Sequence, residues 1–184
     1  MRKPIYKYPD FVQEVTLKRT DGKRYWLTLK IDDTKTDGIA VILKNPSRAD
    51  KTISDKTVYN VSNYIYRNRE NYTELQNIGT VTIVNLIPKY LTDSSKLQDV
   101  KEGIIDDENI RVIDEVCSRN KNVIIAWGNP PMGLDEGYEV LKKMVMAILS
   151  KHKNSVFYVD RMTYNGNPKH GQVWGYNDML IKAK

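Results

Sequence analysis

Residues 38–47, GIAVILKNPS, form a continuous apolar run that ends abruptly in Asn-Pro-Ser. The part from Ile39 to Leu43 has too few polar positions for a half-exposed strand, which predicts a central strand covered on both faces. Ligands bind at the carboxyl ends of strands in open α/β sheets, because the loops diverge there. Pro46 keeps the preceding Asn45 out of the helical region and so fixes the direction of its side chain. Asn45 is therefore a candidate site residue, although a plain strand-to-helix turn is the alternative interpretation.

Three further apolar runs resemble this strand and alternate with predicted helices. The runs are Thr80 to Val84, Val123 to Ala126 and Val156 to Val159. Helices are predicted to begin after a Ser54-Asp55 cap, near Asp106 or Asp107, and at Leu134, the last of them reaching His152. Parallel neighbours need crossover connections, and helices in those connections cover both faces of the sheet. The pattern predicts a three-layer α/β/α fold with a central four-stranded parallel sheet.

The amino-terminal part predicts a β-hairpin. Val12 to Arg19 and Arg24 to Ile31 alternate as strands do, and Asp21-Gly22 between them is typical of a hairpin turn. The length of 184 residues favours one domain. We expect residues 1–37 to be a basic hairpin extension and residues 38–184 to be the α/β core. Thr92 to Gly103 is polar and predicts only weak helix.

Composition narrows the classes of function. The net charge of +6 permits a polyanionic partner, and most of the excess lies in the first thirty residues. Neither a transmembrane helix nor a signal peptide is expected, which favours the cytoplasm and excludes a membrane partner. The single cysteine, Cys117, is interpreted as a core residue. One cysteine and two distant histidines predict no disulfide, no metal site and no cofactor.

Because the carboxyl ends of parallel strands share one edge, polar residues from distant segments should converge there. They are Asn45, Asn85, the turn at Trp127-Gly128, and the final loop that contains His170. Considered one at a time, each residue has a structural interpretation: Asn85 would hold the end of a strand, Trp127 would be a core residue, and His170 would be a surface residue. Taken together, they favour a binding crevice, since loops of this kind often carry function.

The order of these motifs resembles a bacterial and phage family known only as domain of unknown function 1643. The resemblance covers about residues 24 to 175 and rests on Leu43-Lys44-Asn45-Pro46-Ser47 with Asp50, Ser54-Asp55-Lys56-Thr57, Ile83-Val84-Asn85-Leu86, Ala126-Trp127-Gly128 and Pro168-Lys169-His170. That family is similar, more distantly, to the uracil-DNA glycosylase superfamily, whose fold is a short parallel sheet between helices. The chain departs from the superfamily pattern at Leu43 and at Gly171-Gln172.

The resemblance implies roles for particular residues. Asn45 and His170 would be catalytic, with Asn45 placing a water and His170 contacting the base carbonyl. Asn85 would read the pyrimidine edge. Ser47 stands where classical uracil enzymes have a tyrosine that excludes a 5-methyl group. The remaining implied contacts are Pro46, Trp127 and Gly128 to the base, and Lys44, Arg48 and Lys169 to the DNA backbone.

The chemistry of base release can be stated without the family. A glycosylase must extract a nucleotide, hold its hydrogen-bonding edge and stabilise charge on the departing base. An amide such as Asn85 offers a donor and an acceptor in one plane, and His170 can donate to a base oxygen. An amide takes up no proton near neutral pH, so Asn45 is not a general base. Asp50 and Asp55 are the nearest carboxylates and the candidate substitutes as general base. The competing interpretation makes Asp55 a helix cap and Asp50 a loop charge.

Two functions from different classes follow, and the sequence leaves the choice between them open. One is a monofunctional DNA glycosylase, a DNA-repair hydrolase acting on uracil-like or modified pyrimidines, with Gln172, Val173 and Trp174 as an apolar wedge. The other is a catalytically silent pseudo-glycosylase that binds DNA or an acidic, DNA-mimicking uracil-DNA glycosylase inhibitor protein. A free-nucleotide binder is a third, weaker possibility, since no glycine-rich phosphate loop supports it.

Overall fold

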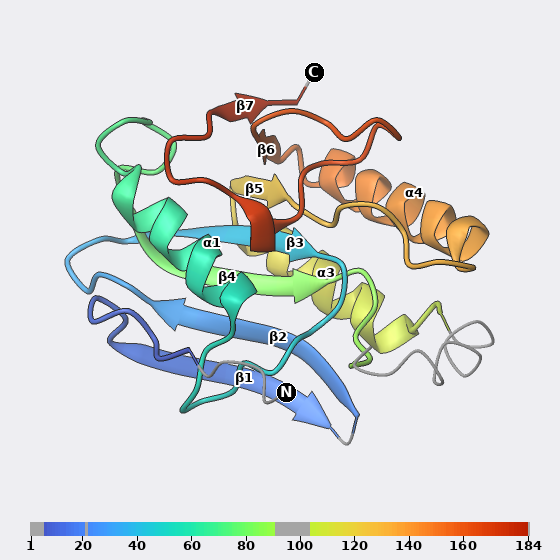
Figure 1. The fold of residues 1–184 in the computed structure, drawn as a ribbon, viewed down its shortest axis with the longest axis horizontal. Helices are drawn as coiled ribbons and strands as arrows, with labels where there is room; N and C mark the ends of the chain where they lie inside the picture. Colours follow the sequence, from blue (N-terminus) through green and yellow to red (C-terminus); the bar gives the residue numbers. More distant parts are fainter. Residues whose placement is uncertain (1–5, 21, 91–103, 184) are drawn as a thin grey trace.

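The computed structural model describes residues 6–20, 22–90 and 104–183. Within them lie a seven-stranded sheet, three α-helices and one short 3-10 helix (Figure 1). The strands are β1 (Glu14–Thr20), β2 (Lys23–Lys30), β3 (Asp37–Leu43), β4 (Ile78–Asn85), β5 (Asn122–Ile125), β6 (Ser155–Val159) and β7 (Leu180–Lys182). The helices are α1 (Lys56–Arg67), α3 (Asp107–Arg119), α4 (Asp135–Lys151) and the 3-10 helix η2 (Gly171–Val173). The predicted weak helix at Thr92 to Gly103 lies outside the described residues.

The sheet is mixed, with the order β1-β2-β4-β3-β5-β6-β7. β3 pairs in parallel with β4 and β5, and β5 pairs in parallel with β6. β1, β2 and β7 join antiparallel. The sequence predicted four parallel strands with the hairpin as an extension, whereas the hairpin is part of the sheet. The reason is visible in β2, whose Leu27 and Leu29 are fully buried in the core against β4.

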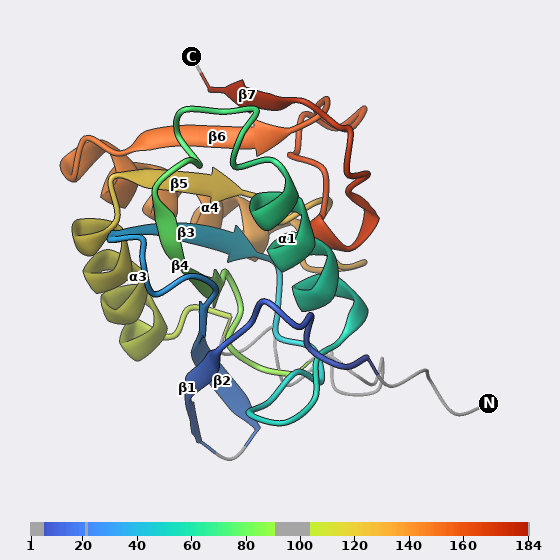
Figure 2. The same cartoon turned by 90° about the vertical axis from the view of Figure 1, so that its left-hand side faces the viewer.

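Helices cover both faces of the sheet, as Figure 2 shows, with α1 on one side and α3 and α4 on the other. Alternate residues of β3 point into two separate apolar clusters. Ile39, Val41 and Leu43 pack with α1, whereas Ala40 and Ile42 pack with α3 and α4. This alternation confirms that the apolar run is a strand buried on both faces.

Two of the helices begin at the predicted cap residues. Asp55 accepts hydrogen bonds from the backbone N–H groups of Thr57 and Val58 at the start of α1, and Asp106 accepts from that of Asn109 at the start of α3. Cys117 is buried, which confirms its place in the core. Among the residues that the structure describes, no helix has the length and apolar character needed to cross a membrane.

Candidate functional site

The ends of β3 and β4 lie side by side at the carboxyl edge. Leu43 is paired with Asn85, and beyond them the N–H of Ile87 donates to the carbonyl of Lys44 at 2.9 Å. The turn after β5 reaches the same edge, where the N–H of Gly128 donates to the carbonyl of Pro168 at 3.0 Å. The structure therefore brings the ends of β3, β4 and β5 together with the loop that carries His170.

That loop, residues 160–179, is held at its base. It joins β6 to the antiparallel β7, and the N–H of Asp160 donates to the carbonyl of Met179 at 2.8 Å. The Lys169 ammonium bridges the two arms, lying 2.9 Å from Asp160 Oδ2 and 2.7 Å from Asp178 Oδ2. Lys169 was expected to contact the DNA backbone, but its charge is already paired with two carboxylates within the loop.

Three side chains, two on α1 and one on the residue that caps its end, hold the same loop in place. Asn60, Tyr64 and Asn68 stand one helical turn apart, and each donates to a loop carbonyl. The acceptors are Gln172 at 2.7 Å, Asp178 at 2.8 Å and Tyr176 at 2.9 Å, respectively. Figure 1 shows η2 lying against α1 as a result. The loop around His170 is thus ordered by contacts that do not involve a ligand.

Two glycines allow the His170 loop to pack closely against its neighbours, which are the turn after β5, α1 and the end of β3. A Cβ on Gly128, whose φ is +66°, would lie 3.0 Å from His170 Cβ. A Cβ on Gly171 would lie 2.7 Å from Val61 Cγ2 of α1 and 3.1 Å from Leu43 Cδ2. Glycine at position 171 therefore has a steric reason, because a side chain there would push the loop off α1 and the end of β3.

His170 is held as a neutral imidazole. Its pKa is lowered from 6.5 to about 4, mainly by burial and secondly by the positive charge of Lys44, while Asp55 acts in the opposite direction. Its Nδ1 accepts the backbone N–H of Gln172 at 3.2 Å. In the neutral ring the proton must then be on Nε2, a tautomer assigned from this hydrogen bond. His170 therefore offers an uncharged N–H donor at the carboxyl edge.

The lowered pKa of His170 predicts acid sensitivity. Between pH 6.5 and about 4 the unfolded chain binds a proton at this ring that the folded chain does not bind, so stability falls as the pH falls through that window. Because the ring is only partly buried, we expect a loss of about 2 kcal/mol. Urea unfolding at pH 7 and pH 4.5 measures it. The His170→Asn variant keeps an acceptor for the Gln172 N–H and should lose less; an equal loss would contradict the assignment.

Asn85 is completely buried, and neither Nδ2 nor Oδ1 has a hydrogen-bond partner among the described residues. Its side chain lies on the α1 face of the sheet, as does the side chain of Leu43, the residue paired with it on β3. The loop at Gly171 covers Leu43. A buried amide without partners costs free energy, so such groups are rare in folded proteins. Asn85 is the site residue whose placement is most unusual.

The Asn45 loop is closed by Asp55. The Asn45 amide donates to the carbonyl of Pro46 at 3.1 Å. Asp55 Oδ1 binds the N–H groups that cap α1, and Oδ2 accepts the N–H of Ala49 at 2.9 Å and the hydroxyl of Ser47. Both oxygens of Asp55 are thus occupied, and the hydroxyl of Ser47 is directed at this carboxylate.

Asp50 makes a local turn of its own. Its Oδ1 accepts the N–H of Thr52 at 2.8 Å, the hydroxyl of Thr52 at 2.9 Å and the N–H of Ile53 at 3.0 Å. The hydrogen bond from the Thr52 N–H is the main cause that lowers the pKa of Asp50. The arrangement favours a structural role for Asp50 and Asp55 over that of a general base.

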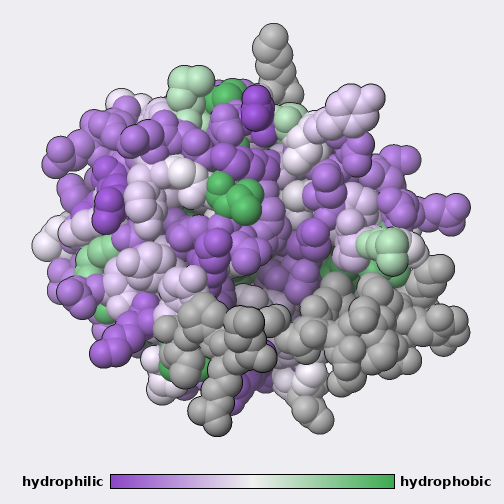
Figure 3. Space-filling model, in the orientation of Figure 1, coloured by the Kyte–Doolittle hydropathy of each residue, from purple (hydrophilic) through white to green (hydrophobic). Residues whose placement is uncertain are grey.

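The remaining predicted residues are dispersed. Pro46 is buried, Arg48 is exposed and Lys44 is half-buried. Trp127 packs in the cluster of α3 and α4, on the opposite face of the sheet from Leu43, and its indole N–H has no partner among the described residues. Trp174 is also buried, so of the predicted wedge only Gln172 and Val173 are exposed. Figure 3 shows a small apolar patch over η2, one of several on a mainly hydrophilic face.

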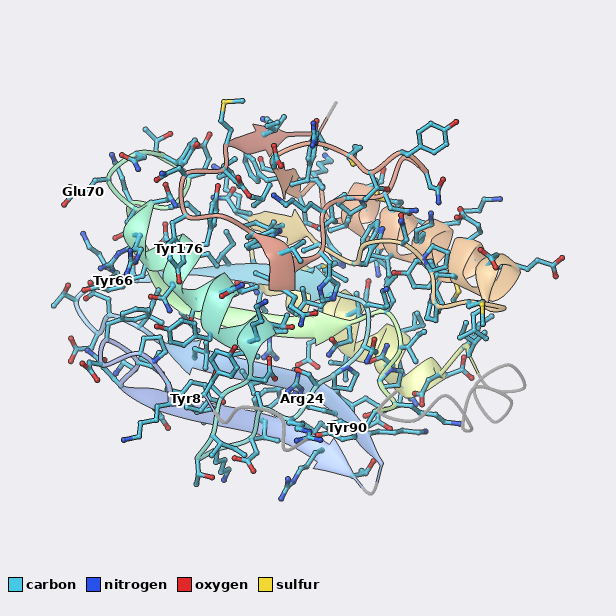
Figure 4. All side chains as sticks on the ribbon, viewed as in Figure 1. Tyr8, Arg24, Tyr66, Glu70, Tyr90 and Tyr176 are labelled. Carbon is cyan, nitrogen blue, oxygen red and sulfur yellow. The ribbon has the colours of Figure 1, made fainter. Side chains whose placement is uncertain are left out.

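Arg24 is a neighbour of the site that sequence reasoning missed. A register shift between Lys18 and Arg19 interrupts the hairpin ladder beside it. The side chain is 1% exposed, and Nη1 donates to the carbonyl of Ala49 at 3.0 Å, while Nε has no partner within the described part of the chain. Figure 4 shows it near Tyr90. Nothing in the sequence separates Arg24 from the other basic residues of the hairpin.

Comparison with known proteins returned one family. Neither the curated proteins nor the solved structures include a match. A family model described as "Protein of unknown function (DUF1643)" matches residues 24–171, which include the ends of β3, β4 and β5 and the loop as far as Gly171. The chain belongs to this family, DUF1643.

Proposed function

We propose that the protein is a uracil-DNA-glycosylase-like protein that holds a pyrimidine-like base of DNA at the carboxyl edge of β3 and β4. The unpartnered amide of Asn85 carries the proposal. A carbonyl and an N–H of a pyrimidine are complementary to the two groups of an amide, and a base would satisfy both at once. An apolar residue would be the better choice for stability alone.

The neutral His170 supports the same proposal. Its Nε2–H is a donor for a base carbonyl, and the short distance from His170 to Gly128 keeps it at the edge where the base would lie. A donor fixed beforehand stabilises negative charge on a departing base without having to reorganise. The parallel neighbours β4, β3 and β5 carry the implied motifs at their ends, and the proposal extends to a glycosylase-like core within the mixed sheet.

One observation favours the catalytically silent alternative. Asn45 is an amide, both oxygens of Asp55 are occupied, and one oxygen of Asp50 accepts three hydrogen bonds. The hydrogen bonds to Oδ1 lower the pKa of Asp50, so neither carboxylate of the Asn45 loop is well suited to activate a water. The second candidate is a pseudo-glycosylase that binds DNA, or an acidic protein that mimics DNA, and releases no base.

Base release decides between the two. Purified protein is incubated with single- and double-stranded oligonucleotides that contain uracil, mismatched thymine or a 5-substituted pyrimidine, and abasic sites are then cleaved with alkali. Strand cleavage that Asn85→Ala abolishes would establish a glycosylase. Binding of DNA or of an acidic inhibitor protein without cleavage would establish the silent alternative. Absence of both binding and cleavage would refute the proposal.

A further inference from the structure

Lys44 and Lys169, the lysine that directly precedes His170 in the sequence, differ in their ion pairs. Lys169 lies within ion-pair distance of two carboxylates, Asp160 and Asp178. The Lys44 ammonium has no carboxylate within that distance among the described residues, although its side chain is half-buried. A partly buried amine without a counterion is destabilised in its charged form. Burial accordingly lowers the pKa of Lys44.

The position of Lys44 is equally specific. It lies between Leu43, the last residue of β3, and Asn45, and its carbonyl is bound to the N–H of Ile87 beyond the end of β4. Its charge also acts on His170, the group proposed to contact the base. A base held between Asn85 and His170 would bring C1′ of its deoxyribose to the carboxyl edge at which Lys44 follows β3.

We propose that Lys44 is a nucleophile that forms an imine with the C1′ aldehyde of an abasic deoxyribose in DNA. The neutral amine attacks C1′ of the open-chain sugar, a C=N bond forms, and the carbonyl oxygen leaves as water with the two protons of the nitrogen. Lysines act as nucleophiles in this way when burial favours the uncharged amine. The inference rests on the proposed DNA-binding function, but it requires no base release and no carboxylate base.

Trapping with borohydride tests the inference. An oligonucleotide with a preformed abasic site is incubated with the full chain and sodium borohydride, which delivers hydride to the imine carbon and leaves a stable secondary amine. We expect a covalent protein–DNA species on a denaturing gel, with the adduct mapped to residue 44 by mass spectrometry. Lys44→Arg keeps the positive charge but forms no stable imine, and should reduce trapping to the level seen without protein.

The matched control is Lys56→Ala, because Lys56 is exposed at the start of α1 and makes no described contact with the site. Trapping should be unchanged in that variant. Equal trapping by Lys44→Arg and the unaltered chain, or no trapping at all, would overturn the inference. Base release in the alkali assay without trapping would overturn it while leaving the proposed function intact. Trapping without base release would support it in a silent pseudo-glycosylase.

Discussion

Replacement of Asn85 by leucine is expected to raise the free energy of unfolding by about 1–3 kcal/mol while abolishing recognition of the base. The side chain is 0% exposed and both of its polar atoms lack partners among the described residues, so an apolar residue removes an uncompensated desolvation cost. Chemical denaturation gives the stability, and DNA binding or base release gives the function. Asn85→Val is a second test with a smaller side chain, because leucine can overpack the space; it should likewise raise the free energy of unfolding and abolish recognition.

Asn109 is the matched control for this prediction. It is 1% exposed and lies close to Asn85, and its Oδ1 also has no partner among the described residues, but its Nδ2 donates to the carbonyls of Asn85 and Leu86 at 2.9 and 3.2 Å. Asn109→Leu should therefore destabilise the protein, by about 1–3 kcal/mol, because it leaves buried carbonyls unpaired. If both variants lose stability to the same extent, the Asn85 amide has a structural partner and the proposed base pocket loses its main support.

Replacement of His170 by alanine should lower the rate of base release by about a hundred- to a thousand-fold, the usual cost of removing one fixed donor to a developing anion. The neutral ring presents its Nε2–H because Nδ1 is occupied by the N–H of Gln172. His170→Gln restores an amide N–H at a similar reach and should recover part of the rate. Single-turnover base release on the substrate found in the alkali assay measures both.

The comparison needs a variant of the same loop that does not face the site. Asn165 is exposed on residues 160–179, and Asn165→Ala should leave the rate unchanged. A His170→Ala variant that releases the base as fast as the unaltered chain would exclude His170 from the reaction. In a silent protein the same variants are compared by DNA affinity, which His170→Ala should weaken.

The sequence predicts the parts of the fold that depend on local pattern. The apolar runs at Ile39 and Thr80 lie in strands β3 and β4, and Asp55 caps a helix because its side chain reaches the next N–H groups. β7 has only three residues and forms by pairing with β6, so no local periodicity announces it. The inclusion of the hairpin in the sheet likewise depends on the contact between β2 and β4.

In the candidate site, too, the sequence predicts some features, whereas others depend on three-dimensional packing. Strand order places Asn45 and Asn85 at one edge, because parallel strands end together. The hydrogen bonds that occupy Asp55 and the ion pairs of Lys169 depend on side-chain geometry, which spacing along the chain does not specify. The orphaned atoms of Asn85 and the burial of Arg24 are consequences of packing and become visible only in three dimensions.

The fastening of the His170 loop has a kinetic consequence. Because β7, Lys169 and the α1 side chains order residues 160–179 beforehand, a ligand meets a site whose conformational entropy has already been lost during folding. Association with single-stranded DNA, in which no base pair has to be opened, should then occur without a slow phase of loop closure, and its rate should depend on encounter and on salt. Stopped-flow traces with a single exponential, whose rate rises linearly with ligand concentration, are the expected signature.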